Sequence, residues 1–540
     1  MNVVINDQYN IGYICTKQQC DSGKADKIAL RWVSPNQVQD YTYANLETSS
    51  NKIANALLNL GVNKGDRVVI FIPKSPELYF IFLGTIKIQA IACILFSAFG
   101  EEALLDRLKD SQAKILFTNK YLLHKIKAIW PNLPDLKKIV VVDADSNESD
   151  RILAYSGLVS QSSDAYQVPQ TPPDVPSVLH YTSGSTGKPK GVLHVHRSVL
   201  SQTATFKNIF GIVDDDIYWC TADPGWVTGV SYGMIGPFSH GITQVNYGGK
   251  YDPEVWFTIL QDEKVTVWYT APTALRMLMQ NSDVDYGKFD LSNLRSIFSV
   301  GEPLNPSVIG WSRRTIHKDI YDTWWQTETG SIMIANRPQL SIRPGSMGKP
   351  FDGIEAAILD DQGNPLPDLS QGNLCLKRGW PSMFVTYLNR KPEYDKRFKD
   401  GYYYTGDMAY RDADGYFWFT GRHDDVINTG GHLVGPFEVE SALLEIPEIA
   451  ESGVIGAPDE MLYEKIVAFV AVKPGVKWTR ELELKVRIYV SNRVSTVATP
   501  QEFMVVDAVP KNKSGKIMRR VLKARYLNQD LGDISTMETN

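Results

Sequence analysis

The 540-residue sequence is poor in cysteine, in histidine and in excess charge of either sign. Its five cysteines, Cys15, Cys20, Cys93, Cys220 and Cys375, are scattered, and an odd number over a long chain argues against a disulfide framework. No second Cys or His pair follows Cys15 and Cys20 at zinc-finger spacing, which argues against a metal site there. These absences indicate a reducing compartment, and we expect a cytoplasmic protein.

The sequence also lacks a strongly basic composition and a long apolar run. Lys and Arg number 56 against 61 Asp and Glu, a formal charge of −5, so we expect no nucleic-acid partner. Lys87 and Gln89 interrupt the most apolar stretch, residues 79–99, well short of the about 20 apolar residues that a membrane span needs. The start, MNVVINDQYN, has no basic segment followed by an apolar one. We therefore expect no secretory signal and no membrane partner.

What is present is an alternation of helices and short strands. Hydrophobic residues make up 43 % and charged residues 22 %, as in globular proteins. Residues 45–62 predict an amphipathic helix that ends at Gly61, and RVVIFIP (67–73) predicts a buried strand. PELYFIFLGTIKIQA, IACILF, KILFTN and KKIVVVDA continue this alternation. The pattern predicts an α/β fold with parallel sheets.

The pattern changes after Gly421. GRHDDVINTGGHLVGP (421–436) is polar and rich in glycine, and a compact run of helices and short strands with a basic tail follows it. A chain of this length favours two or more domains. We predict a large N-terminal domain over residues 1–423 and a small α+β domain over residues 424–540.

The most informative segment is YTSGSTGKPKG (181–191), which follows the strand-like VPSVLH. Its glycines let backbone N–H groups approach an anion, its hydroxyls add hydrogen bonds, and Lys188 and Lys190 add charge. It is not a Walker P-loop, because that motif needs Gly at 182 and Ser or Thr at 189, where this chain has Thr182 and Pro189. Neither G-x-S-x-G nor G-x-G-x-x-G fits. The segment therefore predicts a loop that binds nucleotide phosphates.

This segment resembles the phosphate loop of the adenylate-forming superfamily, which comprises acyl-CoA synthetases, luciferases and carrier-loading adenylation domains. Further segments resemble family motifs in family order: ADPGWVTG (222–229), YTAP (269–272), VGEP (300–303), YDTWWQTETG (321–330), YYYTGD (402–407), GRHDD (421–425) and PKNKSGKIMRR (510–520). ADPGWVTG and DTWWQTETG are most similar to the acetyl-CoA synthetase branch, in its shorter bacterial and archaeal type.

The resemblance implies an AMP-forming acyl-CoA ligase. ATP and acetate, or propionate, would give an acyl-adenylate and pyrophosphate, and coenzyme A would then capture the acyl group; Mg²⁺ would accompany ATP. No Ser/His/Asp or Cys/His constellation is readable, and this chemistry needs none. Two alternatives stay open: adenylation of another short acid or transfer to another acceptor, and a catalytically silent nucleotide-binding regulator, which the presence of Lys516 and Glu328 disfavours.

The resemblance also implies roles for individual residues. Lys516 would orient the carboxylate and stabilise charge at the α-phosphate, and Glu328 would hold magnesium. Asp407 and Arg422 would contact the ribose and phosphate region. Two groups complete the nucleotide site: Thr182, Ser183, Gly184, Ser185, Thr186, Gly187 and Lys188 over the β- and γ-phosphates, and Gly301, Glu302, Pro303, Asp322, Thr323, Trp324, Gln326 and Thr327 around the adenine and α-phosphate.

In the acyl pocket, Trp325 would leave space for two or three carbons, and Val227, Thr228 and Val300 would line the remainder. The resemblance further implies a hinge at Asp424 and a pantetheine tunnel at Gly430 and Gly431. It also implies regulators that modify Lys516.

Two departures from the family pattern affect the CoA step. Leu433 stands where the family usually has arginine, and Ser491 stands where an arginine often meets the CoA phosphates, with Arg493 nearby as a substitute. The residues expected for adenylation are all present, so acyl-AMP formation is the firmer expectation.

Overall fold

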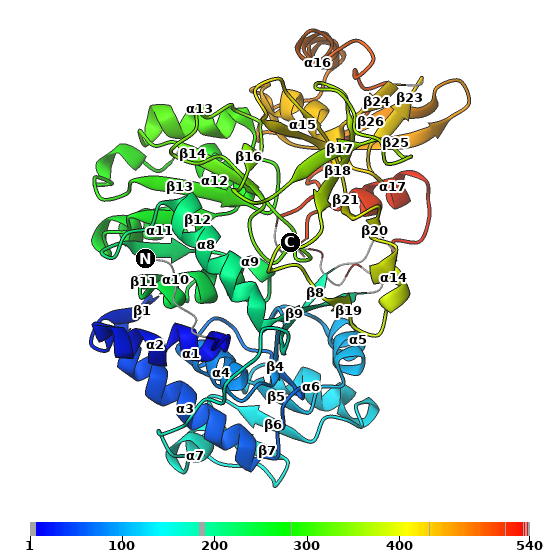
Figure 1. The fold of residues 1–540 in the computed structure, drawn as a ribbon. Helices are drawn as coiled ribbons and strands as arrows, with labels where there is room; N and C mark the ends of the chain where they lie inside the picture. Colours follow the sequence, from blue (N-terminus) through cyan, green and yellow to red (C-terminus); the bar gives the residue numbers. More distant parts are fainter. Residues whose placement is uncertain are drawn as a thin grey trace.

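The structure is a computed structural model that describes residues 7–182, 189–281, 283–430, 432–512, 515–532, 534 and 537. It contains an eight-stranded, a nine-stranded and two five-stranded sheets. Figure 1 shows the eight-stranded sheet at the bottom, the nine-stranded sheet above it and the C-terminal part at the top. The chain passes through these layers largely in order.

The eight-stranded sheet runs in the order β19-β9-β8-β4-β3-β5-β6-β7. Its strands from β8 to β7 are parallel, and β9 and β19 are antiparallel additions at one edge. The strands are β3 (Arg67–Ile70), β4 (Ile91–Ile94), β5 (Ile115–Thr118), β6 (Lys138–Val141), β7 (Ile152–Ala154), β8 (Pro176–Thr182), β9 (Lys190–Val195) and β19 (Thr386–Tyr387). The helices are α3 (Tyr43–Asn59), α4 (Pro76–Lys87), α5 (Glu101–Ser111), α6 (Leu123–Ile129) and α7 (Tyr155–Ser160).

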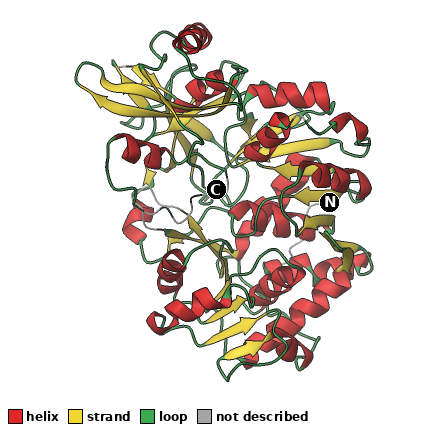
Figure 2. Ribbon diagram, turned by 180° about the vertical axis from the view of Figure 1, so that it is seen from behind, coloured by secondary structure: helices red, strands yellow, loops and turns green. Residues whose placement is uncertain are grey.

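Both faces of this sheet are buried. Val68 and Ile70 of β3 pack into one hydrophobic cluster, while Val69 between them packs into another, because successive strand residues point to opposite faces. Figure 2 shows helices against both sides of the large sheets. This double burial explains why the strands read as continuous apolar runs.

The nine-stranded sheet runs in the order β16-β15-β14-β13-β12-β10-β11-β1-β2 and is parallel from β14 to β1. Its strands are β1 (Ile28–Ser34), β2 (Gln37–Thr42), β10 (Ile217–Cys220), β11 (Thr243–Tyr247), β12 (Val267–Thr270), β13 (Ser296–Val300), β14 (Ile320–Trp324), β15 (Ile334–Ala335) and β16 (Lys349–Pro350). The helices that follow along the chain are α8 (Val199–Phe210), α9 (Val227–Val230), α10 (Gly236–His240), α11 (Pro253–Asp262), α12 (Pro272–Gln280) and α13 (Pro306–Thr315), and α1 (Ile11–Cys15) and α2 (Lys17–Gln19) precede β1.

The two smaller sheets are mostly antiparallel. The third sheet comprises β17 (Ala356–Leu359), β18 (Gly372–Lys377), β20 (Phe398–Lys399), β21 (Tyr402–Arg411) and β22 (Phe417–Arg422), with α14 (Lys391–Asp395) beside it. The C-terminal sheet comprises β23 (Ile427–Thr429), β24 (His432–Val434), β25 (Ile449–Asp459), β26 (Tyr463–Val472) and β27 (Glu502–Val505), with α15 (Pro436–Leu444), α16 (Arg480–Arg493) and α17 (Arg519–Tyr526).

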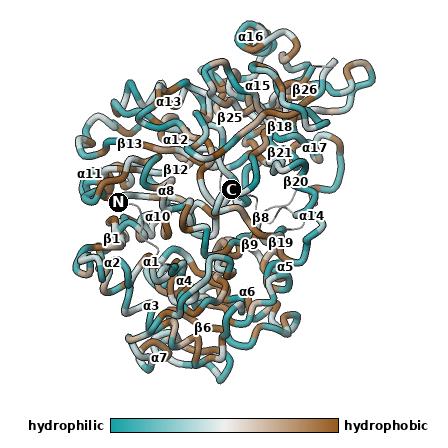
Figure 3. Tube along the Cα trace, viewed as in Figure 1, coloured by the Kyte–Doolittle hydropathy of each residue, from teal (hydrophilic) through white to brown (hydrophobic). Residues whose placement is uncertain are grey.

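The predicted fold class is confirmed: parallel sheets form a large N-terminal part, and a smaller α+β part follows. The predicted helix over 45–62 is α3, which begins with a capping box between Thr42 and Asn45, and Gly61 follows it at a φ of 78°. Figure 3 shows hydrophobic residues concentrated in the strands. Within the described residues, no helix is both long and apolar enough to span a membrane.

Candidate nucleotide and acyl site

The site begins where two neighbouring parallel strands end. Ser299 of β13 pairs with Asp322 of β14, and Val300 pairs with Thr323. The segments that follow, which contain the predicted residues 301–303 and 324–328, therefore leave the sheet side by side, at the edge where open α/β sheets bind ligands. Gly301 has a φ of 94°, a left-handed conformation that side chains other than glycine rarely adopt.

The carboxylate of Asp407 connects this edge to the third sheet. Its Oδ2 accepts hydrogen bonds from Trp324 Nε1 at 3.0 Å and Gln326 Nε2 at 2.9 Å. Its Oδ1 accepts one from Arg422 at 2.7 Å, and Arg422 lies directly opposite it across β21 and β22. Asp407 is only 4 % exposed, so these donors compensate the burial of its charge. Four predicted nucleotide-binding residues thus form one polar cluster.

Three side chains that the sequence did not single out hold the segment from Gln326 to Glu328. Tyr403 Oη donates to Gln326 Oε1 at 2.9 Å, and Tyr387 Oη donates to Glu328 Oε1 at 2.8 Å. His194 Nε2 lies 2.8 Å from the carbonyl oxygen of Thr327. Burial lowers the pKa of His194 to about 4, so the ring is neutral at pH 7 and its Nε2–H donates to that carbonyl.

Of these three, only Tyr403 lies in a recognisable motif, YYYTGD. His194 belongs to β9 and Tyr387 to β19, and both reach the segment from the eight-stranded sheet. The pairing of β9 with β19 brings His194 and Tyr387 close to each other. Their contacts with this segment could therefore be recognised only from the tertiary structure.

Glu328 fits a magnesium ligand. Tyr387 engages one of its carboxylate oxygens, and among the described residues no hydrogen bond or ion pair engages the other. A hard cation that also binds nucleotide phosphates commonly takes one or two protein carboxylates. No cluster of three or more His, Cys, Asp or Glu side chains suited to a metal occurs among the described residues.

Glu302 belongs to a polar network at the start of α12. Arg276 forms an ion pair with Glu302, and Thr273 Oγ1 donates to Glu302 Oε1 at 2.7 Å. The same hydroxyl lies 3.2 Å from the carbonyl oxygen of Gly515, in the C-terminal domain. Gly515 has a φ of 87°, and an added Cβ would lie 2.4 Å from Thr273 Oγ1. Glycine is therefore required where this segment meets α12.

Lys516 follows this contact and lies among the nucleotide-site charges. Its side chain keeps contact with solvent, while the surrounding protein desolvates its amine in part. This partial desolvation lowers the pKa of Lys516, the positive charge of Arg422 lowers it further, and the carboxylates of Asp407 and Asp425 oppose the shift. The fold therefore places the predicted lysine beside the predicted ribose and phosphate residues.

The predicted acyl-pocket residues also meet. Val300 and Trp325 belong to one hydrophobic cluster, and Val227 packs against it. Thr228, next along α9, is buried. The indole of Trp325 is 9 % exposed and packs edge-on against Tyr232, with ring centroids 5.1 Å apart. The arrangement forms a short apolar wall beside the ends of β13 and β14.

The remaining predicted residues either lie elsewhere in the described part of the chain or fall outside it. Ser183 to Lys188 and Gly431 lie outside the described residues, and Thr182 ends β8 opposite Lys190, which pairs with Glu393 at 2.8 Å. Gly430 precedes β24, an edge strand of the C-terminal sheet. Asp424 is exposed in the turn before β23.

Two of the residues that bear on the CoA step, Arg493 and Leu433, also lie outside the nucleotide cluster. Arg493, at the end of α16, is engaged by Glu445 at 2.9 Å. Leu433 is 50 % exposed on β24.

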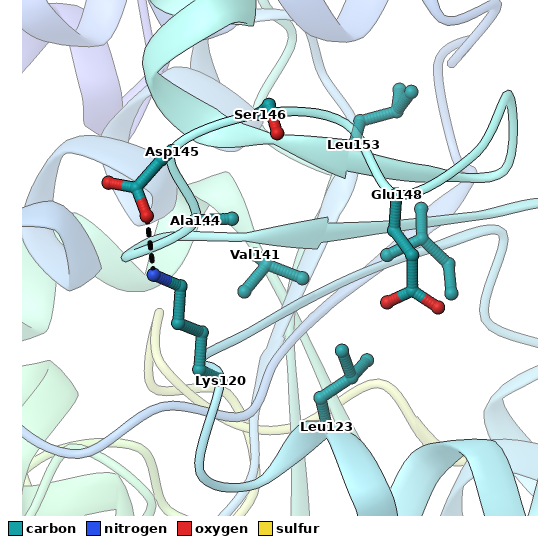
Figure 4. Close-up of a pocket in the computed structure, with 9 residues that line it drawn as sticks. Lys120, Leu123, Val141, Ala144, Asp145, Ser146, Glu148 and Leu153 are labelled. Atoms are coloured by element: carbon teal, nitrogen blue, oxygen red, sulfur yellow. Dashed lines mark hydrogen bonds and ion pairs between the residues drawn. The ribbon is translucent and has the colours of Figure 1, made fainter.

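A separate depression of about 200 Å³ lies at the far side of the eight-stranded sheet (Figure 4). Lys120 and Asp145 form an ion pair across it at 2.7 Å, and Leu123, Val141 and Leu153 line its floor. Its residues come from β6, β7 and their flanking segments, and none of them belongs to the predicted site.

Comparison with known proteins is consistent with this geometry. The family model for AMP-binding enzymes matches residues 17–388, and the model for the C-terminal domain of AMP-binding enzymes matches residues 438–516. The chain belongs to the AMP-binding enzyme family. The unmatched segment between the two models contains the boundary predicted near Asp424.

Two relatives within the family are similar over nearly the whole chain. The acetyl-coenzyme A synthetase of Bacillus subtilis (strain 168) is 48 % identical over 98 % of this chain and 92 % of its own length. The crystal structure of the anthranilate CoA ligase AuaEII in complex with anthranoyl-AMP has a TM-score of 0.88 at 29 % identity, covering 97 % of this chain and 98 % of its own.

The burial of Asp322 predicts a pH-dependent stability effect. Burial raises the pKa of Asp322 to about 7, although Ser299 Oγ donates to its Oδ1 at 2.6 Å. Because the folded state then binds more protons than the unfolded state between about pH 4 and 7, this residue costs stability as the pH rises through that window. We expect the free energy of unfolding of Asp322→Asn, relative to that of wild type, to increase from pH 4.5 to pH 8.5 by about 3 kcal/mol.

The exposed carboxylate Asp319, which pairs with Arg313 on the same side of β14, provides the matched control as Asp319→Asn. Thermal unfolding of the three proteins across the pH range measures the effect. A stability difference between Asp322→Asn and wild type that does not change with pH would contradict this prediction.

Proposed function

We propose that the chain is an AMP-forming acyl-CoA ligase whose preferred acid is acetate. The observation that carries the proposal is the convergence of Lys516, Asp407 and Arg422 beside the ends of β13 and β14, with the wall containing Trp325 next to them. Nucleotide-binding groups, a cation and a short apolar pocket are the parts that an acid-activating enzyme needs in one place.

In the first half-reaction, a carboxylate oxygen attacks the α-phosphorus of ATP. A bond forms between them, the bond from that phosphorus to the bridging oxygen breaks, and pyrophosphate leaves. Asp407 accepts hydrogen bonds from the ribose, and the Lys516 ammonium stabilises the charge that develops at the α-phosphate. Glu328 would hold Mg²⁺, which neutralises phosphate charge when it is bound.

In the second half-reaction, the thiol sulfur of CoA attacks the acyl carbonyl carbon. AMP leaves with the oxygen that joined it to the acyl group, and the thiol proton passes to solvent. The similarity to the acetyl-coenzyme A synthetase of Bacillus subtilis over 98 % of the chain supports CoA as the acceptor. Because Leu433 carries no charge and Arg493 is already paired with Glu445, we expect other residues of this chain to help bind the CoA phosphates.

The hinge and the cellular context complete the proposal. We place the domain boundary at Asp424, in the exposed turn between β22 and β23. The five cysteines form no disulfide, which fits the reducing cytoplasm. Because the Lys516 side chain is exposed, a modifying enzyme could acylate its amine, which would remove the charge that adenylation uses.

The direct test is acid-dependent exchange of labelled pyrophosphate into ATP, run beside an acyl-CoA product assay with acids of two to eight carbons. We expect exchange and thioester formation with acetate. Exchange without thioester would keep the adenylation step and overturn CoA as acceptor. The absence of exchange with every acid would overturn the proposal.

Lys516→Ala should slow adenylation by roughly 100-fold or more, because removing one preorganised charge from a transition state commonly costs a few kcal/mol. The measurement is the rate of pyrophosphate exchange with acetate. Lys511→Ala is the matched control, since Lys511 lies in the same motif but pairs with Glu451 at 2.5 Å. Exchange near the wild-type rate in Lys516→Ala would refute the role given to this lysine.

Trp325→Gly should extend activity to butyrate and longer acids. The indole fills the position that a longer chain would occupy, and one misfitting methylene is worth about 10- to 200-fold in discrimination. The ratio of kcat/KM for butyrate to that for acetate measures the change. An unchanged ratio would mean that the indole is not the end of the acyl pocket.

A further inference from the structure

The side chain of Trp325 is held by a chain of hydrogen bonds that leads out of the acyl pocket. Its Nε1 lies 3.2 Å from Tyr269 Oη, and Tyr269 Oη lies 2.8 Å from Thr323 Oγ1. Thr323 Oγ1 in turn lies 2.7 Å from the carbonyl oxygen of Ser299. Three strand ends therefore share one polar path, because Tyr269 lies on β12, Ser299 on β13 and Thr323 on β14.

The chemistry of the groups fixes the direction of every bond. A carbonyl only accepts, so the single hydroxyl hydrogen of Thr323 goes to Ser299. Tyr269 must then donate its own hydrogen to Thr323, and its oxygen is left to accept from the indole, which only donates. Each hydroxyl hydrogen has one partner, and the Trp325 N–H has one acceptor.

The surroundings make this bond important. Tyr269 is fully buried, and the cluster around the indole is mainly hydrophobic, with Phe210, Tyr232 and Val300 among its members. An indole that turned away from Tyr269 would give up this hydrogen bond inside the core, and a buried N–H that loses its acceptor is unfavourable. The hydrogen bond therefore selects one orientation of the ring.

We propose that Tyr269 is a positioning residue that sets the length of the acyl pocket by holding the Trp325 indole across it. This inference rests on the proposed function and identifies a second determinant of acid length. Without the tyrosine hydroxyl, the indole is free to swing aside, and the pocket admits a longer chain even though the tryptophan is retained.

Tyr232 offers a matched control in the same cluster. Its ring also packs against the indole, with centroids 5.1 Å apart, but its hydroxyl binds elsewhere: Tyr232 Oη lies 2.7 Å from Thr205 Oγ1, and the backbone N–H of Ile332 donates to it at 2.7 Å. Tyr232→Phe removes a buried hydroxyl next to the same ring and leaves the indole hydrogen bond in place.

The experiment compares wild type, Tyr269→Phe and Tyr232→Phe in pyrophosphate exchange with acetate, propionate and butyrate. The readout is the ratio of kcat/KM for butyrate to that for acetate, which a general loss of stability would not raise. We expect Tyr269→Phe to raise the ratio by about 2- to 10-fold, the effect of one buried hydrogen bond, and Tyr232→Phe to leave it near the wild-type value.

Thr323→Val breaks the next bond of the path without changing either ring, so it tests the same inference if Tyr269→Phe does not fold. Thr323→Val should also raise the ratio of kcat/KM for butyrate to that for acetate. Equal ratios in wild type and in the folded variants would overturn the inference, as would an equal rise in both tyrosine variants. Absence of exchange in wild type would instead count against the proposed function.

Discussion

The site depends most on the buried carboxylate of Asp407. It lies on the third sheet and accepts hydrogen bonds from Trp324 and Gln326, which leave the nine-stranded sheet, and from Arg422 on the neighbouring strand. A buried charge is tolerated only where it is paired and hydrogen-bonded. The three donors therefore fix how the third sheet meets the nine-stranded sheet, and they define where a nucleotide can lie between them.

This constraint extends into the C-terminal domain through Arg422 and Lys516. Both carry positive charge near Asp407, and each affects the other, since Arg422 contributes to the lowered pKa of Lys516. The anionic groups of a nucleotide would relieve this mutual repulsion. The two cations are thus placed to bind a phosphate. The negative charge of Asp407 offsets the repulsion between Arg422 and Lys516.

Much of the fold could be predicted from local sequence. The alternation of amphipathic and apolar segments located α3, β3, α4 and β4, because burial on both faces leaves a continuous apolar signature. The motifs also identified Asp407, Arg422, Trp325 and Lys516, which the fold brings into two adjacent clusters. The sequence motifs therefore selected residues that the structure places close together, and the roles given to them are those of the proposed function.

The supporting residues could not be predicted, for a physical reason. His194 and Tyr387 reach the segment around Glu328 from strands of another sheet, and a contact across sheets leaves no periodic trace in the sequence. Tyr269 lay within a recognised motif, but its function depends on a bond to Trp325, 56 residues away. Residue type and motif can locate a ligand site, whereas the hydrogen bonds that orient its members arise only on packing.

The acyl wall shows how specificity and stability are joined in this chain. Trp325, Val300, Tyr232 and Tyr269 are all members of one core cluster, so the same packing that stabilises the nine-stranded sheet would also form the end of the proposed acyl pocket. Close-packed cores resist added volume. A pocket wall that is part of such a core resists a longer acyl chain for the same reason. Discrimination against longer acids therefore needs no dedicated structure.

Polar contacts between the two domains accompany the aromatic contact of Phe419 with Phe437. They include the approach of Thr273 Oγ1 to the carbonyl oxygen of Gly515. They also include hydrogen bonds from Gln280 to Ala450 and from Asn305 to Ser441, each worth about 1 kcal/mol net. Gly515 adjoins Lys516, and Ala450 lies on β25, whereas β24 with Leu433 forms the opposite edge of the C-terminal sheet. The edge formed by β25 thus contacts the N-terminal domain through Gln280, and β24 lies at the opposite edge. If the hairpin of β23 and β24 takes part in the second half-reaction, the domain must turn, and weak polar contacts of this kind permit the turn where an apolar interface would resist it.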